Sequence, residues 1–111
     1  MSDALLVYTT WPDPESARAF AREAVEASLA ACVHVFAPIT SVYRWEGAVE
    51  EAQETPMVLK TTRDAAGALQ ARLTERHPYE LPAFTALAVD ADASPAAFLD
   101  WIADGSRAPS T

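Results

Sequence analysis

The sequence predicts an α+β fold in two layers, an α/β sandwich in which helices cover one face of an antiparallel sheet. Strand-like and helical segments follow one another in the order β-α-β-β-α-β, and a C-terminal helix comes last. The chain has 111 residues, which suits one domain, and half of them are apolar, enough to form a core. We therefore expect residues 1–111 to form one domain with the split βαβ, ferredoxin-like arrangement.

The first strand and helix have clear local signals. Residues 4–9 are an apolar run with β-forming side chains, which predicts a buried strand. Asp13 then offers an N-cap and Pro14 a first helical residue. The inner face of the helix follows from small and apolar residues at helical spacing: Ala17, Phe20, Ala21, Ala24, Ser28 and Ala31.

A long hairpin of the second and third expected strands follows this helix. Residues 32–45 have strand character, which Pro38 interrupts. Glu46 and Gly47 predict a tight turn, because glycine accepts the positive φ that short hairpins require. Residues 49–61 form the returning strand, with Pro56 as an expected break or bulge.

The remaining elements are a helix, a strand and a second, terminal helix. The helix starts near Thr62 or Asp64 and must end before Pro78, which disfavours the α conformation of the residue before it. Residues 84–89 form the last strand, and Ser94-Pro95 is expected to cap the terminal helix. Residues 104–111 are polar and predict a frayed tail.

The hairpin predicts self-association. Residues 49–61 would span about 40 Å when extended, whereas a domain of this length has a radius of gyration of about 13 Å. The projecting part carries exposed apolar and aromatic residues, which usually mark a partner surface: Val42, Tyr43, Trp45 and Val49. A hairpin bent over its own subunit is the alternative. We expect a symmetric homo-oligomer, and the amino-acid composition does not predict how many subunits it has.

Charge and cysteine content exclude several classes of partner. The net charge of −8 disfavours nucleic acids and anionic membranes. The single cysteine, Cys32, fits a reducing compartment. The first residues have no signal-peptide pattern, and no apolar run is long enough to span a bilayer. We expect a soluble, cytoplasmic protein.

No sequence motif predicts an enzyme. The chain has no nucleophile elbow, no Walker A loop and only three glycines. Cys32 follows the C-terminal end of a helix, where the dipole does not favour a thiolate, so it is expected to pack as a small apolar residue.

Metal binding has few candidate ligands. Cys32 and His34 lie two apart on a predicted strand and so point to the same face, where they could hold a soft ion, especially if symmetry brings copies together. Packing beside an interface explains the pair without an ion, and the residues alone favour that interpretation. His77 is the third candidate, in a segment with Tyr79, Glu80 and two prolines that suits a rigid binding loop. Equally, the prolines could simply end a helix and begin a strand.

Lys60 is the only lysine in the chain and lies on an apolar strand. This position suggests a partly buried ammonium with an acidic partner such as Glu80. A plain surface lysine on an edge strand fits the sequence equally well.

Several segments together resemble one protein family. They are LAACV at 29–33, SVYRWEG at 41–47, LKTT at 59–62, HPYELP at 77–82 and FLDWI at 98–102. Over residues 4–103 the chain resembles the CutA divalent-cation tolerance family.

The resemblance implies a ferredoxin-like subunit in a tight homotrimer, with copper or another divalent cation as ligand and His77 as the likeliest protein ligand. The resemblance also implies two copper-linked positions at which some bacterial relatives carry cysteine and histidine, and these positions hold Tyr8 and Arg76 here. The family is also similar in fold to the trimeric PII signalling proteins. That similarity implies an intersubunit pocket for a small anionic ligand, lined by Tyr43, Trp45, Lys60, His77, Tyr79 and Glu80. An assembly scaffold is the remaining alternative.

Overall fold

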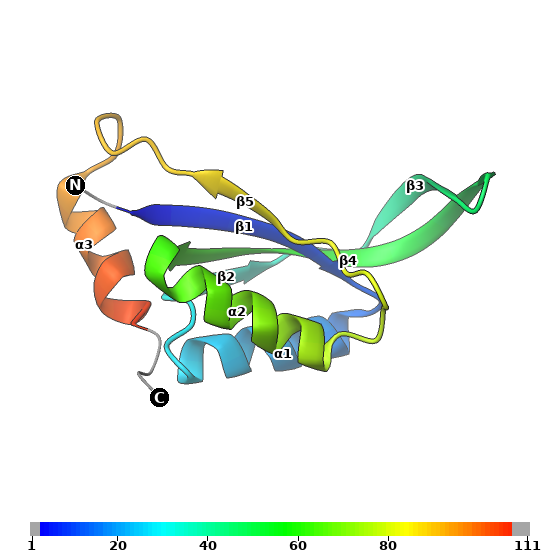
Figure 1. The fold of residues 1–111 in the computed structure, drawn as a ribbon, viewed down its shortest axis with the longest axis horizontal. Helices are drawn as coiled ribbons and strands as arrows, with labels where there is room; N and C mark the ends of the chain where they lie inside the picture. Colours follow the sequence, from blue (N-terminus) through cyan, green and yellow to red (C-terminus); the bar gives the residue numbers. More distant parts are fainter. Residues whose placement is uncertain (1–2, 108–111) are drawn as a thin grey trace.

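Two helices lie on one face of an antiparallel sheet in the computed structural model, which describes residues 3–107 (Figure 1). The main strands lie in the order β2-β4-β1-β5, and β3 pairs with β4 farther along. The bounds are β1 Ala4–Trp11, α1 Pro14–Glu26, β2 Cys32–Val35, β3 Ile39–Trp45, β4 Ala48–Thr62, α2 Arg63–Arg76, β5 Thr85–Ala88 and α3 Ala96–Gly105. The predicted α+β, ferredoxin-like βαββαβ fold with a C-terminal helix is confirmed.

Helices α1 and α2 begin at side-chain caps. The Asp13 carboxylate accepts the Ser16 N–H at 2.8 Å, and the Thr62 hydroxyl accepts the Ala65 N–H at 3.3 Å. Helix α3 differs, since Pro95 precedes it and no side chain caps it. The Ser94 hydroxyl donates instead to the Asp90 carbonyl at 2.7 Å, so the prediction that Ser94 caps this helix is wrong.

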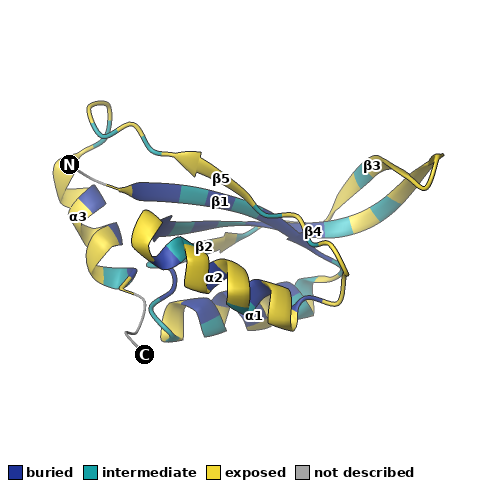
Figure 2. Cartoon of the chain, in the orientation of Figure 1, coloured by how far each residue is buried: buried dark blue, intermediate teal, exposed yellow. Residues whose placement is uncertain are grey.

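The core lies between the sheet and the two helices (Figure 2). Residues from both layers form it: Val7 and Trp11 of β1, Ala17, Phe20, Ala21 and Ala24 of α1, Met57 and Leu59 of β4, and Leu69 and Leu73 of α2. A smaller cluster of Ala4, Leu99 and Ile102 holds α3 against one end of the sheet. The opposite face, which α1 and α2 leave uncovered, is called the open face below. None of the helices within residues 3–107 is long and apolar enough to cross a membrane.

The hairpin of β3 and the first half of β4 projects away from this body (Figure 1). Glu46 and Gly47 have φ values of 50° and 82°, the positive values of a type I′ turn. The molecule is consequently 44 Å long, with a radius of gyration of 14.6 Å. Figure 2 shows that both the hairpin and β5 are mostly exposed.

Strand β4 is continuous through Pro56, but a bulge lies opposite it, because residues 36–38 face only Thr55 and Pro56, in agreement with the predicted break or bulge. Proline has no N–H to donate to a neighbouring strand. The strand that pairs with β4 on this side is itself interrupted opposite Pro56, because residues 36–38 separate β2 from β3. The Pro56 carbonyl still accepts the Phe36 N–H at 2.9 Å. The interruption therefore lies in the neighbour rather than in β4.

The C-terminal part is better ordered than predicted. Helix α3 continues through Gly105, and Ser106 is buried. The Thr62 hydroxyl donates to the Ser106 carbonyl at 3.0 Å. The expected frayed tail therefore does not begin at residue 104, and residues 108–111 lie outside the described part.

Two glycines give a testable contrast in packing. A Cβ at Gly67, in α2, would meet no atom within 4 Å, whereas one at Gly105 would lie 2.8 Å from the Ala31 Cβ. We expect Gly67→Ala to raise the free energy of unfolding by about 1 kcal/mol through helix propensity. Gly105→Ala should lower it by about 1–3 kcal/mol through overpacking. Thermal unfolding of both variants measures the two changes in stability. A change in the same direction in both variants would contradict this description of α3.

Candidate functional site

The segment after α2 is fixed by His77. Its N–H donates the last helical hydrogen bond, to the Leu73 carbonyl at 2.8 Å, and its extended backbone ends the helix before Pro78. The imidazole is only 7% exposed. It packs between the rings of Trp11 and Tyr79, with centroid distances of 4.3 and 4.7 Å. His77 thereby holds the loop against the end of β1.

Both ring nitrogens of His77 are engaged in hydrogen bonds. Nε2 lies 2.7 Å from the Thr10 carbonyl, and Nδ1 lies 3.1 Å from the Tyr79 amide nitrogen. A carbonyl can only accept and an amide N–H can only donate, so the ring is neutral with its proton on Nε2. Neither nitrogen therefore has a free lone pair for a metal. Ligation by His77 stays a prediction that requires one of these bonds to break.

A cleft opens where the hairpin leaves the sheet, beside this loop. We call it the hairpin cleft; it has a volume of about 480 Å³. Its lining comes from β1, β3, β4 and the segment after Pro78: Thr10, Ser41, Tyr43, Glu54, Tyr79, Leu81, Pro82 and Ala83. The Thr10 hydroxyl donates to the Glu54 carboxylate at 3.2 Å. The register pairs Thr10 with Pro56, two residues from Glu54, so alternation places Thr10 and Glu54 on the same, open face.

The pKa of Tyr79 reflects the acidic character of this cleft. Partial burial of its phenol raises its pKa above the ordinary value, and the nearby Glu54 carboxylate raises the pKa further. Tyr43 and Asp13 act in the same direction more weakly. Part of the effect of Glu54 is a side-chain hydrogen bond, so the Tyr79 phenol is directed to this carboxylate.

The structure assembles only part of the predicted pocket. Tyr43 and Tyr79 line the hairpin cleft, with the His77 imidazole packed against Tyr79. Trp45 lies at the far end of β3 beside the turn, and Glu80 is exposed outside the cleft lining.

Lys60 is also apart from the cleft. Its Nζ lies 5.1 Å from the centre of the Phe98 ring, a cation–π contact. Lys60 pairs with Leu6 on β1, four residues or about 13 Å from Thr10. Within residues 3–107 no ion pair joins it to Glu80. One chain therefore does not bring Lys60 and His77 together around an anion.

Thr10 and Glu54 are the cleft residues that the sequence did not indicate. Thr10 follows directly after the predicted first strand, and Glu54 is one of several acidic residues of β4. Their proximity depends on the register between β1 and β4. The hairpin turn fixes only the register between β3 and β4, so no local signal in the sequence could have found them.

Cys32 and His34 form a separate pair on β2. They lie opposite Lys60 and Val58, whereas the alternate residue Val33 packs on the core, so the pair points to the open face. Cys32 is half-buried and His34 is exposed. The two residues are about 7 Å apart along the strand. Among the described residues no third His, Cys, Asp or Glu joins them in a group that could hold a metal ion.

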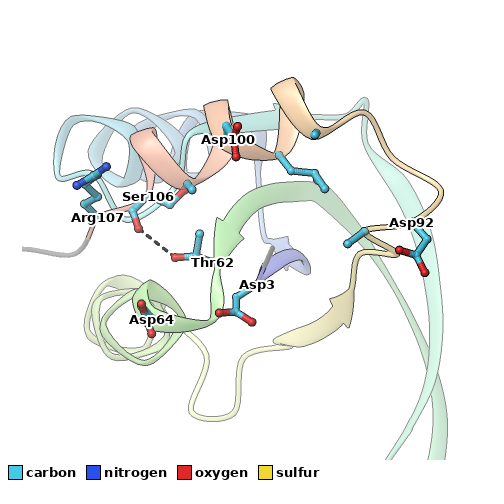
Figure 3. Close-up of a pocket in the computed structure, with 11 residues that line it drawn as sticks. Asp3, Thr62, Asp64, Asp92, Asp100, Ser106 and Arg107 are labelled. Atoms are coloured by element: carbon cyan, nitrogen blue, oxygen red, sulfur yellow. Dashed lines mark hydrogen bonds between the residues drawn. The ribbon is translucent and has the colours of Figure 1, made fainter. Parts of the chain in front are cut away.

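A larger depression of about 780 Å³ lies between α3 and the start of α2 (Figure 3). Four aspartates border it: Asp3, Asp64, Asp92 and Asp100. Figure 3 shows Asp92 at the opposite side from Asp64, so the carboxylates do not converge. The bond between Thr62 and Ser106 closes its inner wall. The depression has acidic character but contains no metal centre within residues 3–107.

Comparison with known proteins identifies the family. The sequence model of the CutA1 divalent ion tolerance protein matches residues 5–105. The chain belongs to the CutA family. It is 40% identical over 101 residues to the divalent-cation tolerance protein CutA of Thermus thermophilus, a match that covers 91% of this chain and 96% of the relative.

Structural and more distant CutA relatives agree with this assignment. The solved divalent cation tolerance protein (Cut A1) from Thermus thermophilus superposes with a TM-score of 0.90 and 38% identity. That match covers 94% of this chain and 99% of the other. The mouse protein CutA is 38% identical over 95 residues, and the match spans 86% of this chain but only 52% of the mouse protein.

Arg76 has a structural role in this chain, and Tyr8 lies within the sheet. Arg76 pairs with Glu23 at 3.0 Å, and Arg72 pairs with the same carboxylate at 2.7 Å, so the network joins α1 to α2. The hydrogen bond from Arg76 is the main cause that lowers the pKa of Glu23. Tyr8 is half-buried on β1 opposite Val58. Neither residue supplies a soft metal ligand.

Proposed function

We propose that the protein is a homotrimeric CutA protein that binds copper or a similar divalent cation and serves in tolerance or response to that ion. The observation that carries this proposal is the pair of Cys32 and His34 on the open face. Thiolate and imidazole are ligands that copper prefers. One subunit supplies only these two, so a complete site needs copies from other subunits.

The open face and the hairpin support assembly. They leave large apolar side chains exposed, including Phe36, Val42, Trp45, Val49, Leu87 and Phe98. Exposure on this scale is typical of an interface rather than of a monomer surface. The edge strands β3 and β5 also leave backbone groups free to pair. The CutA resemblance gives three as the number of subunits.

The geometry shifts the expected metal ligands away from His77. Its two nitrogens already bind Thr10 and Tyr79, whereas the His34 ring is exposed. Binding at His77 would cost a buried hydrogen bond, about 1–3 kcal/mol. Cys32 and His34 carry no such cost.

A copper titration against a competing chelator tests the proposal, with Cys32→Ala, His34→Ala and His77→Ala in parallel. We expect the first two variants to lose copper affinity by about tenfold or more, which corresponds to about 1.4 kcal/mol or more of binding free energy. His77→Ala should keep the affinity of the wild type wherever it is folded. Loss of affinity in His77→Ala alone would overturn the assignment of the ligands, and equal affinity in all four proteins would overturn the site.

The proposal describes a binding protein and not an enzyme. We place the protein in the cytoplasm, because its one cysteine is a free thiol. Its charge of −8 disfavours nucleic acid and anionic membranes as partners.

A further inference from the structure

We propose that the hairpin cleft is a binding site for a small organic cation, an ammonium or guanidinium group on a short carbon chain. This site is separate from the pair of Cys32 and His34 and does not involve a metal. The proposal needs no metal, but the cleft shares the open face with the proposed subunit interface, so binding is measured on the protein as it assembles. It rests on the charge, the aromatic lining and the rigidity of the cleft.

The charge of the cleft suits a cation. Among the described residues that line it, only Glu54 is charged, and its carboxylate interacts with two neutral hydroxyls, those of Thr10 and Tyr79. Among the described residues no arginine, lysine or histidine pairs with Glu54. A half-buried carboxylate without a cationic partner gains most from a ligand that supplies one.

The aromatic and apolar lining selects an organic cation over a metal ion. Tyr43 and Tyr79 are each about two-fifths exposed, at 40% and 39%, and their rings can contact a cation and its carbon chain. Leu81 and Pro82 add apolar surface beside them. A single carboxylate does not complete the oxygen shell of a hard metal ion. The volume of about 480 Å³ lies within the usual range for small-molecule sites.

The cleft is also held in place before any ligand arrives. His77 joins the Thr10 carbonyl on β1 to the Tyr79 amide in the loop, at 2.7 and 3.1 Å. Thr10 in turn joins Glu54 on β4. This chain of bonds fixes the carboxylate and the Tyr79 ring relative to each other, which lowers the entropic cost of binding.

Agmatine, which carries a guanidinium and an ammonium, is the probe for a calorimetric titration in the presence of EDTA. We expect wild-type protein to bind it, and Glu54→Gln to bind at least about tenfold more weakly, as for the loss of one charge-assisted hydrogen bond. Glu51→Gln is the matched control, because it removes the same charge from the same strand. Its side chain points to the opposite face, so its affinity should stay within about twofold of the wild type.

A second pair of variants covers the case in which Glu54→Gln does not fold. Tyr43→Ala should weaken agmatine binding by about tenfold, as for the loss of a cation–π contact that the ligand desolvates, while Thr40→Ala on the opposite face should not. Glutarate, an anion of similar length, should not bind. The proposal is overturned if agmatine does not bind the wild type, if glutarate binds equally well, or if the variant and its control respond alike. Because EDTA removes metals, these results are independent of the copper titration.

Discussion

Replacing His77 with alanine is expected to lower the free energy of unfolding by about 3 kcal/mol, the range for breaking a buried hydrogen-bond network. The imidazole donates to the Thr10 carbonyl and accepts from the Tyr79 amide. Alanine would leave both groups without these partners and would remove the ring that packs on Trp11. Urea unfolding at one fixed protein concentration measures the change, since an oligomer is stabilised by mass action.

His34→Ala is the matched control for this experiment. His34 is exposed on an edge strand and its side chain forms no hydrogen bond within the described part of the chain, so its removal should change stability by less than about 0.5 kcal/mol. Equal effects of the two substitutions would contradict the structural role of His77. The comparison also shows whether any copper effect of His77→Ala comes from lost structure.

Leu87→Asp is expected to break the oligomer. Leu87 lies on β5, pairs with Leu6 on the open face and is 54% exposed in one subunit. In a single subunit a polar residue at this exposed position costs little. At an interface, however, it would bury a charge without a partner, which costs several kcal/mol. Sedimentation at micromolar concentration should therefore show that the assembly dissociates.

Val25→Asp is the control, because it makes the same change at a similar exposure of 43%. Val25 lies on α1, in the helical layer on the other side of the sheet. This variant should keep the mass of the wild type. Dissociation of both variants, or of neither, would contradict the location of the interface on the open face.

The elements that the sequence predicts well are those with local chemical signals. Asp13 and Pro14 mark the start of α1, Glu46 and Gly47 the hairpin turn, and Pro78 the end of α2. Each signal acts within a few residues through a cap, a positive φ or a missing N–H. The fold class follows from their order along the chain.

The candidate site depends on contacts that no local pattern contains. Glu54 and Thr10 meet only because β1 and β4 pair in one register, and a shift of one residue would place them on opposite faces. The same register places Lys60 far from His77, although both belong to motifs of one family. The hydrogen bonding of the His77 ring likewise depends on Thr10, which lies 67 positions away in the sequence.

The central claim is that copies of this chain complete one another at the open face. Sedimentation equilibrium of the wild-type protein tests it most directly, without any ligand or substitution. One chain has a mass of 12.0 kDa, so three copies give about 36 kDa, and we expect that mass down to micromolar concentration. A mass of 12.0 kDa throughout would contradict the claim, since the apolar open face and the pair of Cys32 and His34 would then have no partner subunit.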